Sequence, residues 1–392
     1  VFPDEPDMIY YGIPESTGEG NEYTFLHQGQ LTIICPDPYK YGDEVIVEFP
    51  SDTVIVENPG TAPSEPVFEL TATKQTTFAM VTNGEQYMAI GRPEDAIDVP
   101  ESDREVVLND DASSLVGWSA YTSGSTLYNL GIVGGKMGVY NGFAFYAEEY
   151  GSNPNGWVGP AIRRSLPEQL QDFMITIDIE MRNLGGGVGR IVLFGMDAND
   201  NLVFTMGMMD PTATYANNRA LFGVGPNNYT WINYQGDNNR VVWNDARLQL
   251  RIQRKGQVYE GWIAEKLDPE GKRLTGRHWD SYHDTANQFQ EPLAQIGIYI
   301  AKAKHYDTFP MRFHGLTAWK LFNLEDYQIP YIAEEGDLIT FDHVNREALI
   351  NGYPVQFDFG GDFFELYRGH NSLVVLPENT FDTTVRFRPR YR

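Results

Sequence analysis

The sequence predicts an all-β chain in which a second β-sandwich is inserted into a first one. Short apolar segments rich in β-branched and aromatic residues recur about every 8–12 residues, which is the spacing of strands in a sandwich. Turn-forming residues are frequent, with 38 Gly and 23 Pro among 392 residues. The net charge of −25 is uneven, at −16 over 1–104, −4 over 105–325 and −5 over 326–392. All seven Trp lie in the central block, which marks it as a separate domain.

The two flanks are predicted to join as one discontinuous sandwich made of 36–104 and 326–392. An Asn351-Gly352 pair between apolar residues predicts a hairpin in the second flank. Residues 92–104 have the acidic, Pro-containing composition of a linker. Strands are predicted at 30–35, 45–49, 53–56, 67–72, 77–81, 87–91, 337–342, 349–355, 372–376 and 384–388.

The central block, residues 105–325, is predicted to be a jelly-roll sandwich, because its length of about 220 residues fits that architecture. One short helix is expected at 167–170, where Pro167 precedes Glu168 and Gln169. Strands are predicted at 173–182, 190–195, 201–207, 247–254, 258–264, 294–301 and 312–322.

Composition also excludes several classes of protein. An acidic chain offers no basic face to nucleic acid or to anionic lipid. Cys35 is the single cysteine, so an internal disulfide or a zinc site built on cysteines is excluded. We expect no transmembrane helix and no signal sequence. Because the first residue is Val1, we expect a processed or truncated chain.

Five segments carry a resemblance to a known family. They are 31–41, which contains Asp37-Pro38-Tyr39-Lys40-Tyr41, and 349–352, 362–366, 369–373 and 385–391. They resemble the distal tail protein family of long-tailed phages that infect Gram-positive bacteria. The resemblance covers roughly 1–104 and 326–392. It implies that 1–35 is the last segment of an N-terminal belt domain and that the flanking sandwich is galectin-like.

The insert resembles the extra modules of "evolved" members of this family, through residues 157–167 and 170–173. The resemblance implies a jelly-roll module, similar to carbohydrate-binding modules, that binds host wall polysaccharide. It also implies a six-fold ring of copies that contacts the tail tube and the tail-associated lysin or fibre proteins. Since most of the belt is missing, we expect this chain to be monomeric in isolation.

Aromatic residues among amides and charges are the candidates for saccharide binding. An indole or phenol ring stacks on the apolar face of a sugar, while nearby amides and charges bond its hydroxyls. Trp262 and Trp319 are assigned to the core, and partly buried packing is the alternative for every candidate. Further polar candidates are Asp237, Asn238 and Asn239. The aromatic candidates, placed in three polar loops, are Trp157, Tyr229, Trp231, Trp243, Trp279 and Tyr282.

Motifs for other chemistry are weak. Glu148-Glu149 and Glu334-Glu335 are interpreted as solvated charge rather than as a glycosidase pair. Asp197, Asn199 and Asn201 are weak calcium candidates, and a hairpin turn is favoured there. The glycine-rich segment 185–189 predicts a hairpin loop rather than a phosphate cradle. Arginines at 386, 388, 390 and 392 alternate on one strand, either as a solvated edge or paired with an acidic face.

The sequence therefore predicts a structural protein of the phage tail tip, a baseplate hub, located in the virion after synthesis in the host cytoplasm. Its insert is predicted to bind host cell-wall polysaccharide without cleaving it. No cofactor, metal, nucleic acid or membrane partner is expected. Two alternatives stay open: the insert degrades glycans, or it serves as a spacer or subunit contact.

Overall fold

The computed structural model describes residues 5–17, 21–23, 26–28, 31–95, 97–128, 130–235 and 243–392. The chain folds as two compact units: unit 1 is Val1–Glu101 with Asp326–Arg392, and unit 2 is Ser102–Glu325. Every regular element in the described ranges is a β-strand, which confirms the predicted all-β fold class. None of the described residues belongs to a helix that is long and apolar enough to cross a membrane.

Unit 1 contains a β-sandwich whose two sheets each combine strands from both flanks. β8 (Val67–Ala72) lies between β31 (Leu338–Asp342) and β35 (Phe381–Phe387), and β34 (Gly369–Leu376) lies between β7 (Thr53–Asn58) and β9 (Phe78–Thr82). Neither flank can therefore complete a sheet alone. The remaining strands are β6 (Val45–Glu48), β32 (Glu347–Ile350) and β33 (Tyr353–Val355) in the larger sheet and β10 (Tyr87–Gly91) in the smaller.

The core of this sandwich is made by alternate residues of both sheets, such as Phe68, Val81, Phe341 and Leu373, all buried. The predicted hairpin joins β32 to β33. Its turn residues Asn351 and Gly352 have φ of 49° and 76°, as a two-residue hairpin turn requires.

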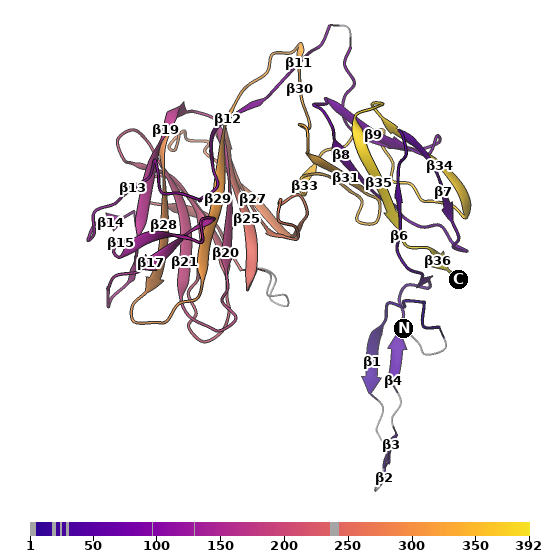
Figure 1. Ribbon diagram of the computed structural model, residues 1–392, viewed down its shortest axis with the longest axis horizontal. Coiled ribbons are helices and arrows are strands. Elements are labelled where there is room, and N and C mark those ends of the chain that lie inside the picture. The colour runs from indigo at the N-terminus through magenta and orange to yellow at the C-terminus, as the bar shows by residue number, and fades with distance from the viewer. Residues whose placement is uncertain are drawn as a thin grey trace. The chain divides into compact units, whose positions relative to one another are not determined.

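Smaller ladders flank the sandwich. β1 (Ile13–Thr17) pairs with β4 (Leu31–Ile34), β2 (Asn21–Tyr23) with β3 (Leu26–Gln28), and β5 (Lys40–Tyr41) with β36 (Arg390–Tyr391). At the unit boundary, β11 (Val99–Glu101) pairs in parallel with β30 (Gln328–Pro330), and the two lie side by side in Figure 1. The entry to the insert and the exit from it are thus held together, as a tolerated insertion requires.

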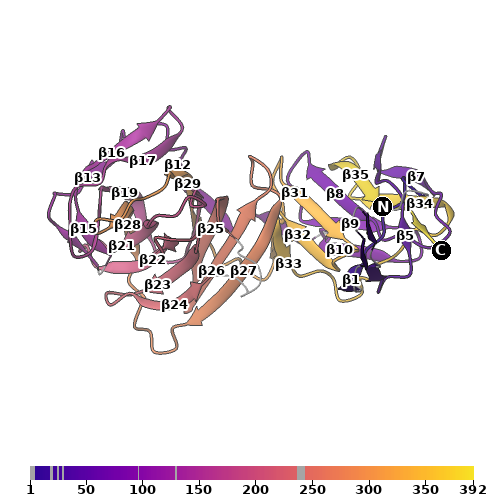
Figure 2. The ribbon, with the colours of Figure 1, turned by 90° about the horizontal axis from the view of Figure 1, so that it is seen from below.

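Unit 2 is a sandwich of an eight-stranded and a ten-stranded sheet, so the predicted insertion of one β-sandwich into a discontinuous second one is confirmed. Figure 2 shows β25, β26 and β27 side by side, and likewise β21 to β24. The first sheet contains β12 (Arg104–Asp110), β16 (Lys136–Tyr140), β17 (Ala144–Glu149), β20 (Phe173–Met181), β25 (Ala246–Lys255), β26 (Val258–Lys266), β27 (Leu274–His283) and β29 (Met311–Leu321). The second contains β13 (Ser119–Ala120), β14 (Thr126–Leu127), β15 (Gly131–Val133), β18 (Trp157–Gly159), β19 (Ala161–Leu170), β21 (Gly189–Met196), β22 (Leu202–Asp210), β23 (Arg219–Val224), β24 (Tyr229–Tyr234) and β28 (Leu293–Ala303).

The predicted helix at 167–170 is wrong, because these residues extend β19. Leu170 is fully buried and pairs with Leu293, so tertiary packing overrides the local helical signal. Pro167 lies within a register shift of the β19–β28 pairing, between Ser165 and Leu170. A residue without an N–H is tolerated at such an irregularity.

The core of unit 2 fixes which side chains of the eight-stranded sheet face outward. In β20 the odd residues, such as Phe173, Ile175 and Ile177, belong to the core between the sheets, and in β25 the even ones do. Because side chains alternate along a strand, Thr176 and Arg251 project from the opposite face. The outer side of the ten-stranded sheet has its own apolar cluster, which includes Leu127, Val192 and Tyr299.

Candidate functional site

The predicted aromatic residues lie mostly on strands rather than in loops. Tyr229 and Trp231 belong to β24, and Trp279 and Tyr282 belong to β27, so the loop prediction for these two segments was wrong. Both are edge strands, in which polar and aromatic residues occupy outward positions. The strands fix their orientation through register, and the six candidates do not form one site.

Trp243 is a core residue. It is 2% exposed, and its indole Nε1–H donates to the carbonyl of Gly276 at 2.7 Å. Tyr234 and His278 pack against its ring. No ring face is left for a ligand, so its assignment to saccharide binding was wrong. The neighbouring candidates 237–239 lie outside the described residues.

Three candidates meet where β24 and β27 end their respective sheets. The rings of Tyr229 and Tyr282 are 5.2 Å apart, and those of Trp231 and Tyr282 are 6.3 Å apart. Tyr229 is 55% exposed, while Trp231 packs against Phe222 of the core. This cluster therefore seals the edge between the sheets and presents one phenol to solvent.

The fourth surface aromatic, Trp279, lies on the outer face of the eight-stranded sheet and is 54% exposed. Trp262, expected in the core, lies on the same outer face, with its ring 5.4 Å from that of Trp279 and 14° from parallel. Trp319 is also outside the core, because Leu316 and Ala318 are the core residues of its strand. Alternation along β26 and β29 places these side chains, and apolarity alone misassigned them.

A cross-strand row leads to this Trp pair. Direct partners in the register run from β12 across five further strands: Asn109, Thr317, Thr176, Arg251, Trp262 and Trp279. Neighbouring strands lie about 4.8 Å apart, so the row is about 24 Å long. Thr176 Oγ1 is buried and lacks a hydrogen-bond partner. We call these six residues the outer-face row.

Beside this row lies a charged cluster centred on Glu180. Arg182 Nε donates to Glu180 Oε1 at 2.6 Å, Arg312 is 3.1 Å from the same oxygen, and His314 Nε2 is 2.9 Å from Oε2. Burial opposes ionisation of Glu180, but these contacts outweigh it and lower its pKa to about 2. Burial lowers the pKa of His314 as well, so a neutral imidazole donates from Nε2 at pH 7.

Several carboxylates of the described residues are stabilised in their ionised form by hydrogen bonds or ion pairs. Cleavage of a glycosidic bond needs one carboxyl group with a raised pKa next to an ionised one. Among the described residues, every carboxyl group with a resolved shift has a lowered pKa: Glu5, Asp111, Glu180, Asp197 and Asp284. This pattern is that of structural carboxylates that accept hydrogen bonds.

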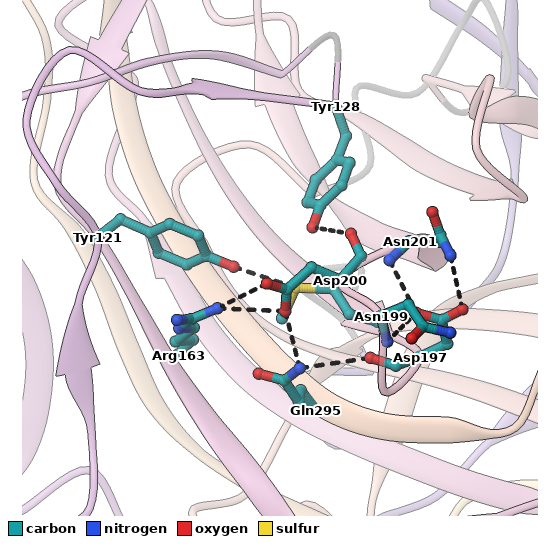
Figure 3. A network of polar contacts seen from close by, with 9 residues as sticks. Tyr121, Tyr128, Arg163, Asp197, Asn199, Asp200, Asn201 and Gln295 are labelled. Carbon is teal, nitrogen blue, oxygen red and sulfur yellow. Dashed lines mark hydrogen bonds and ion pairs between the residues drawn. The ribbon is translucent and has the colours of Figure 1, made fainter.

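The weak calcium candidates form the turn between β21 and β22 (Figure 3). Asp197 Oδ1 accepts from the backbone N–H of Asn199 at 2.7 Å and of Asn201 at 2.8 Å, and its Oδ2 accepts from the Asn201 side chain. Asp200 accepts from Arg163 and Gln295. The carboxylates are therefore engaged within the protein, and no cluster of metal-ligating residues occurs in the described ranges.

The remaining motifs have local roles. Gly186 and Gly187 form a turn after β20, and their N–H groups donate to the carbonyls of Asn183 and Ala213, so they form no free phosphate cradle. The terminal arginines do not form one continuous strand, because β35 ends at Phe387. Arg386 pairs with Glu44 at 3.5 Å, and Arg390 pairs with Glu65, so these two arginines pair with acids of the same unit.

Comparisons with known proteins bear on both units. Residues 302–391 match the family model described as siphovirus-type tail component, C-terminal domain. The distal tail protein of Bacillus phage SPP1 is 39% identical over 78 residues, which cover 19% of this chain and 31% of that protein. The chain thus spans about a third of the length of this curated relative.

Two solved structures resemble the chain over a little more than half of its length. The CBM2 module of the evolved Dit of Lactobacillus casei BL23 phage J-1 is 13% identical with a TM-score of 0.46, and it covers 57% of this chain and 99% of that one. The catalytic domain of an endo-1,3-beta-glucanase from Thermotoga petrophila RKU-1 is 12% identical with a TM-score of 0.37, and it covers 57% and 100%.

Proposed function

From the siphovirus-type tail-component domain that residues 302–391 of this chain carry, we propose that the chain is a structural protein of a phage tail tip whose unit 2 binds host wall polysaccharide without cleaving it. The resemblance to distal tail proteins is confirmed by this match, which contains the four C-terminal segments, and by the SPP1 relative. Segment 31–41 lies outside the matched residues. The matched strands β31 to β36 share sheets with β5 to β10, which supports assigning most of unit 1 to the same kind of domain.

The observation that carries saccharide binding is the stacked Trp pair at the end of the outer-face row. The exposed indole of Trp279 offers a flat apolar face on which a sugar ring stacks, and Trp262 holds that indole from behind. Arg251, which follows Trp262 in the row, lies farther along the same face, where its guanidinium is a donor for the hydroxyls of a sugar chain that runs along the row. A row of about 24 Å accommodates several consecutive rings of a linear glycan.

Binding through one exposed indole and a few polar groups gives modest affinity for each copy. In a ring of copies at the tail tip, avidity raises the overall affinity without any new contact. We therefore place the protein in the virion, with copies of itself, the tail tube and the lysin or fibre proteins as partners. The isolated chain, in this proposal, is monomeric and binds weakly.

The test is binding of the full chain to purified wall polysaccharide from Gram-positive cells, measured by calorimetry or on a glycan array. Trp279→Ala should weaken binding about tenfold, since it removes the stacking platform. Tyr215→Ala removes an aromatic side chain that is 61% exposed elsewhere in unit 2 and should change nothing. Undiminished binding by Trp279→Ala would refute the site.

The same assay separates the alternatives. Release of reducing ends during incubation would identify a glycan-degrading enzyme, against the lowered carboxyl pKa values around Glu180. Absence of binding to every wall polysaccharide tested, at millimolar sugar, would favour a spacer or a subunit contact.

A further inference from the structure

Unit 2 contains two buried arginines that differ in how their donors are satisfied. Arg254 is fully buried, and its guanidinium donates to the carbonyls of Leu170, Gln171 and Glu291. Arg190 is 5% exposed, yet its Nε and Nη2 atoms have no hydrogen-bond partner. A buried donor without an acceptor is costly, so Arg254 is explained by the fold and Arg190 is not.

Aromatic rings surround the guanidinium of Arg190, and Tyr299 also interacts with it as a side-chain hydrogen-bond partner, while Nε and Nη2 stay without an acceptor. Its guanidinium lies over the indole of Trp157 at 4.4 Å and over the ring of Tyr299 at 5.3 Å. Burial lowers the pKa of Arg190 to about 10, partly offset by Tyr299, so the side chain stays charged at pH 7. Among the described residues no carboxylate forms an ion pair with it. The stacking fixes the plane of the guanidinium and leaves its edge unused.

The two unpartnered atoms define the chemistry of a missing ligand. Nε–H and Nη2–H lie on one edge of the planar guanidinium and point in the same direction, which is the fork that binds two oxygens of one oxyanion. Trp157, which is partly exposed, opens β18 after the loop Gly151-Ser152-Asn153-Pro154-Asn155-Gly156. Its indole adds a surface on which a sugar ring can stack.

We propose that Arg190 and Trp157 form a second saccharide subsite, on the ten-stranded sheet, that recognises an oxyanion carried by an acidic sugar. The carboxylate of a uronic acid and the phosphate of a phosphorylated sugar or polyol share this chemistry. Nε and Nη2 are buried in the present conformation, so the ligand enters when side chains around Arg190 move aside. This inference rests on the proposed saccharide-binding function of unit 2, but it uses neither Trp279 nor the rest of the outer-face row.

The test uses the full chain and three probes: an oligogalacturonide, glycerol 1-phosphate and a neutral galactoside. Ligand-observed NMR and calorimetry should detect the first, the second, or both, and should detect weaker binding of the neutral probe at this subsite. Binding of the acidic probes should weaken as salt rises, as for any contact dominated by charge. Binding of the oligogalacturonide would identify a carboxylate as the ligand group, and binding of glycerol 1-phosphate would identify a phosphate.

Arg190→Met should weaken binding of the acidic probe at least tenfold, because it removes the fork, and Arg190→Lys should do the same although it keeps the charge. Arg163→Met is the matched control, since Arg163 also lies over a ring, that of Tyr121 at 5.2 Å, but is paired with Asp200. It should leave binding of the acidic probes unchanged.

Stability gives a second readout that a purely structural arginine would not match. Removing a buried, unpaired cation should leave the melting temperature of Arg190→Met unchanged or raise it. A clear fall in melting temperature together with unchanged binding by Arg190→Lys would overturn the proposal, as would failure of both acidic probes to bind the native chain. If Trp279→Ala abolishes polysaccharide binding while the acidic probe still binds, the two sites are separate. If Trp279→Ala leaves binding intact, the outer-face row is refuted and the Arg190 subsite is still testable.

Discussion

The indole rings of Trp262 and Trp279 lie 14° from parallel, with their centroids 5.4 Å apart, on adjacent strands of the outer face of unit 2. One ring is half-exposed and the other supports it from within the sheet. The pair makes a rigid apolar platform beside polar neighbours. Rigidity favours binding because a ring that is already fixed loses little conformational entropy when a ligand stacks on it.

The supporting role of Trp262 predicts an effect on binding without loss of the fold. Trp262→Ala should weaken saccharide binding about fivefold, because Trp279 then samples other rotamers. Trp262→Phe, which restores an aromatic support, should recover most of the affinity. Calorimetry with the polysaccharide that binds the native chain measures both. Equal affinity of Trp262→Ala and the native chain would show that the support is irrelevant.

Arg254 predicts a large effect on stability. Its guanidinium joins the end of β19 to residue 291, just before β28, through Gln171 and Glu291, so Arg254→Met removes a donor from these part-buried carbonyls and from the buried carbonyl of Leu170. We expect a loss of about 3 kcal/mol in the free energy of unfolding, or roughly 6–12 °C in melting temperature. Lys255→Met, at the adjacent exposed position, should stay within about 0.5 kcal/mol. Calorimetric melting of both variants is the measurement.

His343 predicts a pH dependence that belongs to unit 1. It is 1% exposed among Phe68, Phe363 and Phe364, and burial lowers its pKa to about 4, partly offset by Asp342. Between pH 6.5 and 4, His343 is protonated in the unfolded chain but stays neutral in the folded unit. Stability therefore falls as the pH is lowered through this window, by about 3 kcal/mol in total.

The measurement for His343 is urea unfolding from pH 7 to pH 4, followed by circular dichroism. All seven Trp lie in unit 2, so Trp fluorescence follows that unit separately. His343→Leu should flatten the pH dependence seen by circular dichroism, and His370→Gln, at an exposed position, should not. In unit 2 the stabilisation that ionised Glu180 gives is lost only as the pH falls from about 4.5 to about 2, because its pKa is lowered to about 2. A slope that survives in His343→Leu would assign the effect to other groups.

Half of the described strands, mainly those in the middle of the sheets, could be predicted because each depends on a local pattern. β8, β20 and β28 begin and end within a residue or two of the expected bounds, since apolar alternation and turn residues mark them. The prediction of a helix at 167–170 was wrong because Leu170 is buried by tertiary packing, which the local sequence does not show. Polar edge strands such as β24 and β27 were missed because their composition is that of loops.

The proposed binding surface could be predicted only in part, because it depends on the register between distant strands. Thr176 and Arg251 are direct partners although 75 positions separate them, and no local signal records that pairing. Aromatic composition did single out Trp279 and Trp157, and it could not show that they lie on different sheets. The unpartnered fork of Arg190 is likewise visible only from the contacts around it.

The parallel pairing of β11 with β30 makes unit 2 an exchangeable cassette. Val99 is the partner of Gln328, and Glu101 is the partner of Pro330, so both connections leave unit 1 at one place. A bridge from Glu101 back to Gln328 has to reverse direction between parallel strands, so about a dozen residues would close unit 1 without breaking any ladder of its sandwich. Recombination at these two points would exchange unit 2 as a whole and leave the sandwich of unit 1 unchanged.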